Sequence, residues 1–348
     1  MIESGVRIAV VGATGVVGRE IIEILEERQF PYSSLKVIAS ERSAGQIIEL
    51  NERELEVEAP SEDSFNDIDI AFFSAGAKIS EEFAPIASKS GAIVIDNSSY
   101  FRMNQEVPLI VPEVNSRILR EHLQNLKEKQ GTIIANPNCS TIQLVVTLKP
   151  LIETAGLKRV VVSTYQSVSG AGKQGMDELW DQSLSIFNQS ETKVEKFSKQ
   201  IAFNVIPHCD LFLDNGYTKE EAKVVNESRK ILNLKDLKIT VTAVRVPVFS
   251  CHSESVNIEF DKKFSAEQVR DVLSKSPGLV VLDDPTEGVY PTAIDLAGTD
   301  ATYVGRIRED ESIENGVNLW IVADNLRKGA ALNAVQIAEL VLSIQRPH

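Results

Sequence analysis

Cysteine is scarce in this sequence, and long apolar runs are absent. Three cysteines among 348 residues cannot form the dense disulfide framework of a secreted domain, so we expect a protein of the reducing cytoplasm. No apolar run approaches the roughly 20 residues that a membrane-spanning helix needs. Residues 1–7 also lack the charged-then-apolar order of a signal peptide. We therefore expect a cytoplasmic protein with no membrane partner.

Positive charge is also in short supply, with 36 Lys and Arg against 50 Asp and Glu and a formal net charge of −14. This balance argues against nucleic acid and anionic membranes as partners. Any anionic ligand must therefore meet a local cluster of Arg and Lys. Only four histidines are present, and no Cys or His pair has the spacing of a zinc site. We expect no metal.

The composition that remains is that of an ordinary globular protein, with 43% apolar and 25% charged residues. A chain of this length is sufficient for two domains. Short apolar strands alternate with helices up to about residue 139, and longer alternating strands follow. The pattern predicts an α/β protein with an N-terminal Rossmann-type parallel sheet and a second, α+β domain with a mixed sheet.

The first strand and helix predict a dinucleotide site. Residues 7–11 form a continuous apolar run of the buried parallel type, and an amphipathic helix extends to about residue 27. Between them lies a turn that contains Gly12, Gly15 and Gly18. This spacing is a variant of the Rossmann fingerprint, in which the helix N-terminus receives a pyrophosphate. A tight turn without a ligand is the alternative.

The residues after the second predicted strand, 35–40, distinguish NAD from NADP. An acidic side chain there binds the ribose 2′-hydroxyl of NAD, whereas Arg and small hydroxyl residues accept the 2′-phosphate of NADP. The sequence reads Ser40-Glu41-Arg42-Ser43. Arg42 and Ser43 can together bind a phosphate, so we favour NADP. Glu41 keeps NAD open.

Two further strands bring polar loops to the same edge of the predicted sheet. Residues 69–74 and 92–96 are apolar, with a helix predicted at about 80–90 between them. Arg102 follows the second of these strands, where open α/β sheets bind their ligands. Arg102 is therefore a candidate anion-binding residue, and a solvated loop arginine is the alternative.

The segment Asn136-Pro137-Asn138-Cys139-Ser140-Thr141 offers a candidate nucleophile. A short strand at 132–135 precedes it and an apolar helix follows it. Asn138 is a favourable N-cap residue, which places Cys139 in the first helical turn. There the helix dipole and the unpaired N–H groups favour a thiolate, which can attack a bound carbonyl carbon. A small buried side chain at the helix start is the alternative interpretation.

The second half of the chain predicts a mixed sheet covered by helices. Residues 239–246 and 254–260 read as long antiparallel strands joined through residues 247–252. The other predicted elements are strands at 159–167, 302–308 and 317–322, and helices at 142–154, 174–187, 219–232 and from 327 onward.

Three polar residues of this half are candidates for chemistry. His252 is a natural acid–base partner for a cysteine nucleophile, although a structural hydrogen bond would also explain it. Arg245 lies in a β-branched strand and must be paired or face a cavity. Its planar guanidinium matches a carboxylate, and a salt bridge across the sheet is the alternative. Asn325 is either a helix cap or a cofactor contact.

Taken together, these motifs resemble the bacterial aspartate-β-semialdehyde dehydrogenase family over essentially the whole chain. The resemblance rests on the order and separation of the motifs, because each one alone is weak. The matching segments are residues 12–18, 40–45, 96–99 with Arg102, 136–141, 165–172, 220–223, 245–247 and 252–254.

The resemblance implies a homodimeric enzyme that uses NADPH to convert L-aspartyl-4-phosphate into L-aspartate-4-semialdehyde and phosphate, on the route to lysine, methionine, threonine and isoleucine. It implies an NADP-binding domain at residues 1–138, completed by a C-terminal helix at 327–348, and a catalytic and dimerisation domain at 139–326. It also implies that Cys139 forms a thioester, that His252 is the acid–base group and that Gln166 orients the intermediate.

The same resemblance implies that Arg245 binds the α-carboxylate, Glu220 the α-ammonium group, and Arg102 and Lys223 the phosphate. Glu221 competes for the role of Glu220, but Glu220 shares a helix face with Lys223, so we choose Glu220. The implied substrate-binding residues are Arg102, Asn138, Gln166, Glu220, Lys223 and Arg245. The implied cofactor contacts are Gly12, Thr14, Gly15, Val16, Val17, Arg42, Ser43, Ser169, Gly170 and Asn325.

Two alternatives stay open at this point. A reductase of N-acetylglutamyl phosphate would share the nucleotide turn and the cysteine, but its N-acetylated substrate has no α-ammonium group for Glu220. A catalytically inactive nucleotide-binding or assembly protein of the same fold would not need Cys139, His252, Gln166 and Arg245 together.

Overall fold

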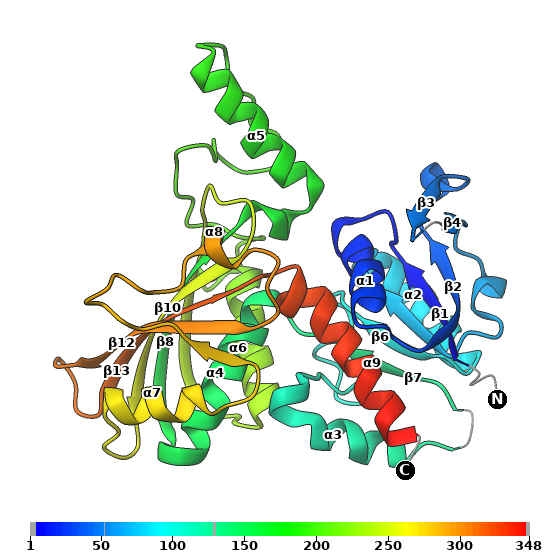
Figure 1. Cartoon of the computed structure of the whole chain (residues 1–348). Helices are drawn as coiled ribbons and strands as arrows, with labels where there is room; N and C mark the ends of the chain where they lie inside the picture. Colours follow the sequence, from blue (N-terminus) through cyan, green and yellow to red (C-terminus); the bar gives the residue numbers. More distant parts are fainter. Residues whose placement is uncertain (1–4, 52, 128–129, 346–348) are drawn as a thin grey trace. The chain divides into compact units, whose positions relative to one another are not determined.

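The computed structural model describes residues 5–51, 53–127 and 130–345. Internal contacts divide the chain into two compact units: unit 1 contains the residues up to Pro137 and from Ala330 onward, and unit 2 is Asn138–Gly329. In Figure 1 the blue-to-cyan elements and the red helix α9 (Leu332–Gln345) belong to unit 1. The expectations for residues 1–4 and for the end of the predicted C-terminal helix, 346–348, lie outside the described residues.

Unit 1 is built on a parallel sheet with the strand order β2-β1-β5-β6-β7. The continuous apolar runs explain this arrangement, because a parallel strand is covered on both faces and buries both sets of side chains. Every residue of β5 and β6 is buried, and the predicted Rossmann-type sheet is confirmed. The strands are β1 (Val6–Val11), β2 (Tyr32–Ile38), β5 (Ile70–Phe73), β6 (Ile93–Asp96) and β7 (Thr132–Ala135).

Helices that pack on this sheet complete the core of unit 1. Ile21 and Leu25 of the first helix pack in one apolar cluster with Ile8 and Val10 of β1 and with Val335 of α9. Helix α9 also contacts α1 and α3, so the end of the chain returns to unit 1 after unit 2 is complete. The helices are α1 (Val16–Glu27), α2 (Ala77–Lys89), α3 (Pro112–Gln124) and α9.

The start of the C-terminal helix and several short elements of unit 1 differ from the prediction. Residues Arg327–Ala331 form a π-helix, and the α-helix begins only at Leu332, whereas the sequence predicts one helix from 327. A single π-turn of this kind is typical of functional sites. The elements that the sequence did not predict are the hairpin β3 (Ile47–Leu50) and β4 (Arg53–Glu56), and the short turns η1 (Glu41–Ser43) and η2 (Glu62–Phe65).

Unit 2 contains a mixed sheet in the order β11-β12-β13-β10-β8-β9. The mixed sheet is as predicted, but the two strands expected at 239–246 and 254–260 are not neighbours, because β8 pairs with both of them. The sequence pattern fixes which residues face the core and not which strands pair. The strands are β8 (Leu157–Gln166), β9 (Lys238–Arg245), β10 (His252–Phe260), β11 (Leu279–Val281), β12 (Thr302–Asp310) and β13 (Gly316–Ala323).

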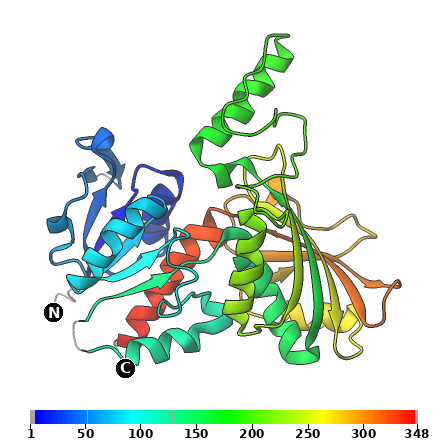
Figure 2. The same cartoon turned by 180° about the vertical axis from the view of Figure 1, so that it is seen from behind.

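Helices α4, α6 and α7 contact this sheet, and α5 projects away from it (Figures 1 and 2). Helix α4 is buried along most of its length, which explains its nearly continuous apolar sequence. Helix α5 instead exposes Trp180, Leu184 and Phe187. The helices are α4 (Cys139–Ala155), α5 (Lys173–Phe187), α6 (Lys219–Leu232), α7 (Ala266–Ser274) and α8 (Ala293–Leu296), with the short turn η3 (Val168–Ala171).

Strand β10 carries a fully buried carboxyl group. Glu254 has no exposed surface and lies in register between Thr164 of β8 and Ile321 of β13. Burial raises the pKa of Glu254 well above its usual value, and Gln143 of α4 offsets this only in part. The folded chain therefore holds this proton more tightly than the unfolded chain does.

Replacing Glu254 by Gln is expected to stabilise the protein at neutral and alkaline pH. Because the folded pKa of Glu254 is raised, its contribution to stability is complete below the unfolded pKa of about 4.3 and is lost as the pH rises toward the folded pKa. Glutamine stays neutral throughout. The Tm of Glu254→Gln should exceed that of the wild type by roughly 2–4 °C for each 1 kcal/mol regained at pH 8, and by less at pH 5.

Thermal scans between pH 5 and pH 8 measure this difference, with a Glu311→Gln variant as the control, because Glu311 is exposed. A Tm difference for Glu254→Gln that stays constant over this range would contradict the prediction.

Candidate active site

The chain before α4 places Cys139 at the first residue of a helix. The N-cap residue is Asn138, whose Oδ1 accepts hydrogen bonds from the backbone N–H groups of Ser140 at 3.0 Å and Thr141 at 3.3 Å. This is the cap that the sequence predicts. Cys139 is half-buried, so its sulfur lies at the positive end of the helix dipole without being sealed in the core.

The other two cysteines are poorer nucleophiles. Cys209 and Cys251 are both buried. Burial raises the pKa of Cys209 to about 11 and that of Cys251 to about 12, so both are thiols at neutral pH. Among the three, Cys139 is the one whose surroundings suit attack on a substrate.

The sheet of unit 2 brings three of the predicted residues into one row. Gln166, the last residue of β8, is in register with Arg245, the last residue of β9. On the other side of β8, Tyr165 is in register with Ser253, so the next residue, Gln166, lies opposite His252. Residues directly opposite on paired strands project to the same face. His252, Gln166 and Arg245 are all buried at one end of the sheet.

Gln166 and Glu220 connect this row to the two residues beside Cys139. Nε2 of Gln166 donates to Oγ of Ser140 at 3.0 Å and to Oε1 of Glu220 at 3.3 Å. The same Glu220 oxygen accepts from Nδ2 of Asn138 at 2.8 Å. The residues on both sides of Cys139 are thus bonded to predicted site residues from β8 and α6.

Helix α6 gives its two adjacent carboxylates different environments. Glu221 completes a capping box, because its Oε2 accepts from the backbone N–H of Thr218 at 2.6 Å. Its Oε1 accepts from the backbone N–H of Ala243 at 3.0 Å. Both oxygens of Glu221 thus fix the helix start, while Glu220 faces the start of α4. This geometry favours Glu220 over Glu221 as a ligand for a substrate amine.

Lys223 lies one turn beyond Glu220 and is held by two carboxylates. Its Nζ is 2.7 Å from Oδ2 of Asp210 and 3.2 Å from Oε2 of Glu220. Burial alone would lower the pKa of Lys223, but Glu220 and Asp210 outweigh it and the pKa is raised. Lys223 is therefore charged at neutral pH, and an anionic ligand must compete with these carboxylates for it.

His252 is held in one tautomer by the loop after β8. Its Nδ1 accepts a hydrogen bond from the backbone N–H of Ser167 at 3.1 Å. A backbone N–H can only donate, so we assign the proton of the neutral ring to Nε2. Burial, and after it the Arg245 guanidinium, lowers the pKa of His252 to about 3. The ring is therefore neutral at pH 7 and presents an N–H donor.

The loop after β8 packs closely against Arg245 and His252. Nη1 of Arg245 donates to the carbonyl of Ser167 at 2.6 Å. A Cβ at Gly170 would lie 3.1 Å from Nη1 of Arg245 and 3.2 Å from Nε2 of His252. A side chain at Gly170 would therefore press on both of these residues. Among the described residues no carboxylate forms an ion pair with Arg245, and its guanidinium donates to a backbone carbonyl instead, so the alternative of a salt bridge across the sheet is wrong.

Asn325 ties the same loop to the end of β13. Its Oδ1 accepts from Oγ of Ser167 at 3.0 Å and from Oγ of Ser169 at 3.2 Å, and its Nδ2 donates to Ser169 at 2.9 Å. Asn325 is buried. The observed bonds of Asn325 and Ser169, two predicted cofactor contacts, thus fix the loop that holds His252.

Unit 1 places the predicted glycine turn between β1 and α1. Gly12 has a φ of +90°, and a Cβ there would lie 2.8 Å from the carbonyl carbon of Ser74. A Cβ at Gly18 would lie 2.1 Å from the carbonyl oxygen of Gly12. Gly15 is the N-cap of α1 and has no side chain to cover the helix start. The turn therefore fits a pyrophosphate. The other predicted contacts here are Thr14, Val16 and Val17.

Two predicted cationic residues have different surroundings in unit 1. Arg42 and Ser43 lie in η1, which follows β2, the neighbour of β1, and Arg42 is exposed. Arg102 is only 7% exposed and donates at 2.9 Å to the carbonyl groups of Asn136 and Asn97. The alternative of a solvated loop arginine at position 102 is therefore wrong.

Gly329 lies close to the candidate nucleophile Cys139, although the sequence did not mark it as a site residue. It lies in the π-helix, and an added Cβ would be 3.0 Å from Cβ of Cys139. The only signal in the sequence is the run of small residues at 329–331, which indicates close packing but not the partner.

A Gly329→Ala variant is expected to lower kcat by about 10-fold or more, because the new methyl group must displace Cys139 from its position. The substrate KM should change little, since Arg245 and Glu220 are not moved. Steady-state kinetics measure both constants, and the Tm checks that the variant is folded. A wild-type kcat would mean that the π-helix yields instead of Cys139.

The two other histidines that the structure describes, His122 and His208, have structural contacts. His122 is half-buried, and its Nε2 lies 2.7 Å from Oγ1 of Thr132. Burial lowers its pKa. The ring of His208 stacks on Phe212, with 4.4 Å between ring centroids.

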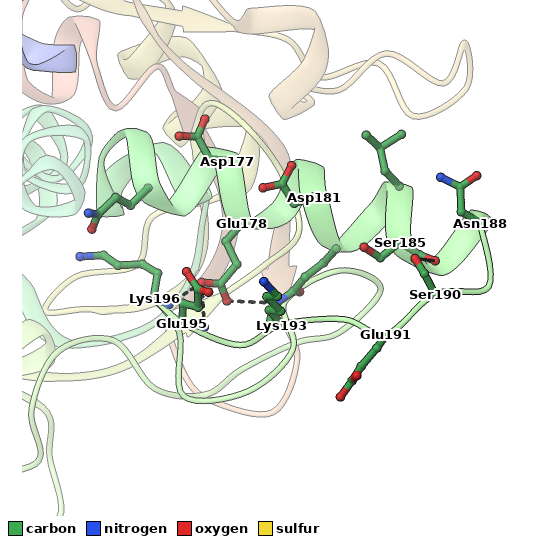
Figure 3. Close-up of a pocket in the computed structure, with 13 residues that line it drawn as sticks. Asp177, Glu178, Asp181, Ser185, Asn188, Ser190, Glu191, Lys193, Glu195 and Lys196 are labelled. Carbon is green, nitrogen blue, oxygen red and sulfur yellow. Dashed lines mark hydrogen bonds between the residues drawn. The ribbon is translucent and has the colours of Figure 1, made fainter.

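A cavity of about 770 Å³ lies along α5, between the helix and the loop that follows it (Figure 3). Glu178 reaches across to this loop and accepts hydrogen bonds from the backbone N–H groups of Glu195, at 3.2 Å, and Lys196. All the residues that line the cavity lie between 174 and 196, so the cavity is separate from the predicted site residues. Its polar groups hold the loop on the helix.

Within the described residues, no group of three or more His, Cys, Asp or Glu side chains could hold a metal ion. Of the helices that the structure describes, none is both long enough and apolar enough to cross a membrane.

Comparison with known proteins identifies the family. Residues 7–123 match the semialdehyde dehydrogenase NAD binding domain, and residues 148–328 match the semialdehyde dehydrogenase dimerisation domain. The chain is 52% identical to aspartate-semialdehyde dehydrogenase of Aquifex aeolicus over 340 residues. This matched region covers 97% of this chain and 98% of that protein.

Solved structures agree with this result. Aspartate semialdehyde dehydrogenase II of Vibrio cholerae, complexed with ASA, has a TM-score of 0.92 and 46% identity over 98% of this chain and 99% of that one. The Candida albicans enzyme with NADP has a TM-score of 0.75 and 25% identity over 98% and 99%. The chain therefore belongs to the aspartate-semialdehyde dehydrogenase family, whose members are oxidoreductases with a nicotinamide cofactor.

Proposed function

We propose that this chain catalyses the reversible, NADPH-dependent reductive dephosphorylation of L-aspartyl-4-phosphate to L-aspartate-4-semialdehyde and phosphate, through a thioester on Cys139. The supporting observation is the row of His252, Gln166 and Arg245, which Gln166 links by a hydrogen bond to the start of α4. One end of one sheet thus offers a hydrogen-bond donor, an orienting amide and a carboxylate-binding guanidinium next to a nucleophile.

Cys139 supplies the covalent step. Its thiolate attacks the acyl carbon, the new C–S bond replaces the C–O bond to phosphate, and phosphate leaves with the electron pair of that bond. NADPH, when bound, supplies a hydride for the reduction. The tetrahedral adduct on Cys139 then breaks its C–S bond, which releases the aldehyde and regenerates the thiolate.

The polar groups around Cys139 bind the substrate. Arg245 offers the planar fork that a carboxylate needs for two parallel hydrogen bonds. Glu220 offers a carboxylate to the α-ammonium group, and its bonds to Asn138 and Gln166 fix it beside the nucleophile. Lys223 and Arg102 complete the proposed set as phosphate ligands. These local cations answer the question of how a chain of charge −14 binds an anionic substrate.

His252 meets the substrate first as a donor, through Nε2–H. Such a donor stabilises the negative charge that develops on the carbonyl oxygen during attack. Because Arg245 contributes to the low pKa of His252, a carboxylate bound at Arg245 would offset that charge and raise the pKa. Substrate binding would thereby prepare His252 for its acid–base role.

We propose NADP as the cofactor. The glycine turn fits a pyrophosphate, and exposed Arg42 with Ser43 follows the strand beside it, where a 2′-phosphate would be bound. The proposed contacts are Gly12, Thr14, Gly15, Val16, Val17, Arg42, Ser43, Ser169, Gly170 and Asn325.

We further propose that residues 1–138 with 327–348 form the NADP-binding domain and that 139–326 form the catalytic and dimerisation domain of a cytoplasmic homodimer. The match of residues 148–328 to a dimerisation domain supports this. The exposed apolar side chains Trp180, Leu184 and Phe187 of α5 also support it, because such side chains are typical of an interface.

The phosphate-dependent oxidation of L-aspartate-4-semialdehyde tests the proposal. We expect reduction of NADP with a higher kcat/KM than reduction of NAD. In the other direction, aspartyl phosphate should be a better substrate than N-acetylglutamyl phosphate. Preference for the N-acetylated compound would contradict the proposed substrate, and preference for NAD would contradict the proposed cofactor alone.

A further inference from the structure

Glu227 is a buried carboxylate that the proposed mechanism does not use, and it lies next to the residue that precedes Cys139. It lies on α6 and is 1% exposed. Its Oε2 accepts a hydrogen bond from the backbone N–H of Asn138 at 2.7 Å. Asn138 directly precedes Cys139, so this bond holds the peptide from which the nucleophile projects.

Two other helix starts of unit 2 show what this bond replaces. In α6 the N-cap N–H of Thr218 is bound by Glu221, three residues on, and in α7 (Ala266–Ser274) the N-cap N–H of Ser265 is bound in the same way by Gln268. These are capping boxes. In α4 the corresponding residue is Thr141, whose hydroxyl has no hydrogen-bond partner among the described residues. The cap of α4 is instead completed by Glu227, 89 residues away in sequence.

With this bond, every polar group of Asn138 is used. Its carbonyl accepts from the N–H of Ile142 at 3.0 Å. Its side-chain oxygen accepts from the first turn of α4, and its side-chain nitrogen donates to Glu220. Glu220 and Glu227 are seven residues apart, two turns of α6, and so lie on one face of that helix. Asn138 is thus held at two points by a single helix.

We propose that Glu227 is a positioning residue for the nucleophile: by accepting the Asn138 N–H it fixes the Asn138–Cys139 peptide and the direction of the Cys139 side chain. The inference rests on the proposed function for its kinetic consequence. Displacement of a nucleophile by about 1 Å can cost on the order of 100-fold in rate even where binding is intact. Loss of Glu227 therefore lowers kcat more than it raises KM.

Two substitutions separate the hydrogen bond from the charge. Glu227→Gln keeps an acceptor oxygen at the same reach, and Glu227→Met keeps the volume without an acceptor. We expect Glu227→Met to lose about 10-fold or more in kcat with KM within about threefold of the wild type, and Glu227→Gln to stay within about threefold in both. If the Met variant does not fold, Glu227→Asp replaces it, since its oxygen is withdrawn by about 1.5 Å.

Hydrogen exchange gives a readout that needs no substrate. Peptides that contain residues 138–141 should exchange faster in Glu227→Met, or in Glu227→Asp, than in the wild type, and at the wild-type rate in Glu227→Gln. Glu178→Met is the matched control, because Glu178 is also a buried carboxylate bound to backbone N–H groups, those of Glu195 and Lys196. It should raise exchange there and not at residues 138–141.

The outcomes distinguish the two proposals. Wild-type kcat and wild-type exchange in Glu227→Met would overturn the positioning role. Equal losses in the Gln and Met variants would also overturn it, because the charge and not the acceptor would then matter. Absence of turnover in the wild-type chain would contradict the proposed function, while the hydrogen-exchange experiment would still decide the role of Glu227.

Discussion

Cys139→Ala is expected to abolish turnover, by on the order of 10⁴-fold or more, and to leave NADPH binding nearly unchanged. The reason is that the thioester cannot form without a sulfur at the start of α4, whereas the glycine turn belongs to unit 1 and is complete without it. Steady-state assays in the phosphate-dependent direction measure the first effect. Titration of NADPH fluorescence with the variant measures the second.

Cys209→Ala is the control for this experiment. Cys209 is buried, and its thiol stays protonated at neutral pH, so its loss should leave kcat close to the wild-type value once folding is verified by the Tm. Turnover that survives in Cys139→Ala would point to another nucleophile, and loss of NADPH binding would point to a folding defect.

Arg245→Lys is expected to lower kcat/KM by about 100-fold, with most of the effect in KM. Lysine keeps the positive charge but presents a point charge in place of the fork that makes two parallel hydrogen bonds to a carboxylate. It would also lose the short bond from Nη1 to the carbonyl of Ser167, which fixes the loop that holds His252. A 100-fold loss corresponds to about 2.7 kcal/mol, which is the contribution of one hydrogen bond to a charged group, at about 1.5–3 kcal/mol.

Arg159→Lys provides the matched control for Arg245→Lys. Arg159 lies near the opposite end of β8, is exposed and is in register with Lys238 of β9. The same chemical change at that position should leave kcat/KM within about twofold of the wild type. Wild-type kinetics in Arg245→Lys would remove Arg245 from the substrate site.

The parts of this site that depend on neighbouring residues could be predicted from the sequence. Asn138 caps α4 because its side chain bonds to the N–H groups two and three residues ahead, which is a short-range pattern. The glycine turn was also predictable, since it requires close backbone approach at Gly12 and Gly18. Arg245 stood out because a guanidinium in a buried strand needs a partner or a cavity.

The parts that depend on pairing between distant segments could not be predicted in this way. The position of β8 between β9 and β10 places His252 beside Gln166. The alternation of apolar and polar residues within a strand does not indicate which strands become neighbours. Glu227 lies in a helix rich in Glu and Lys, where its sequence context is that of a solvated residue. Its burial follows only from the packing of α6 on α4.

Helix α6 carries Glu220, Lys223 and Glu227 within eight consecutive positions, and both glutamates bond to Asn138 from one face of the helix. Insertion or deletion of one residue between Glu220 and Glu227 would rotate one end of the helix against the other by about 100°. Either Glu220 or Glu227 would then point away from Asn138. The number of residues between Glu220 and Glu227 is therefore more strictly constrained than their identity. Substrate preference can change by substitution within this segment, but not by insertion or deletion.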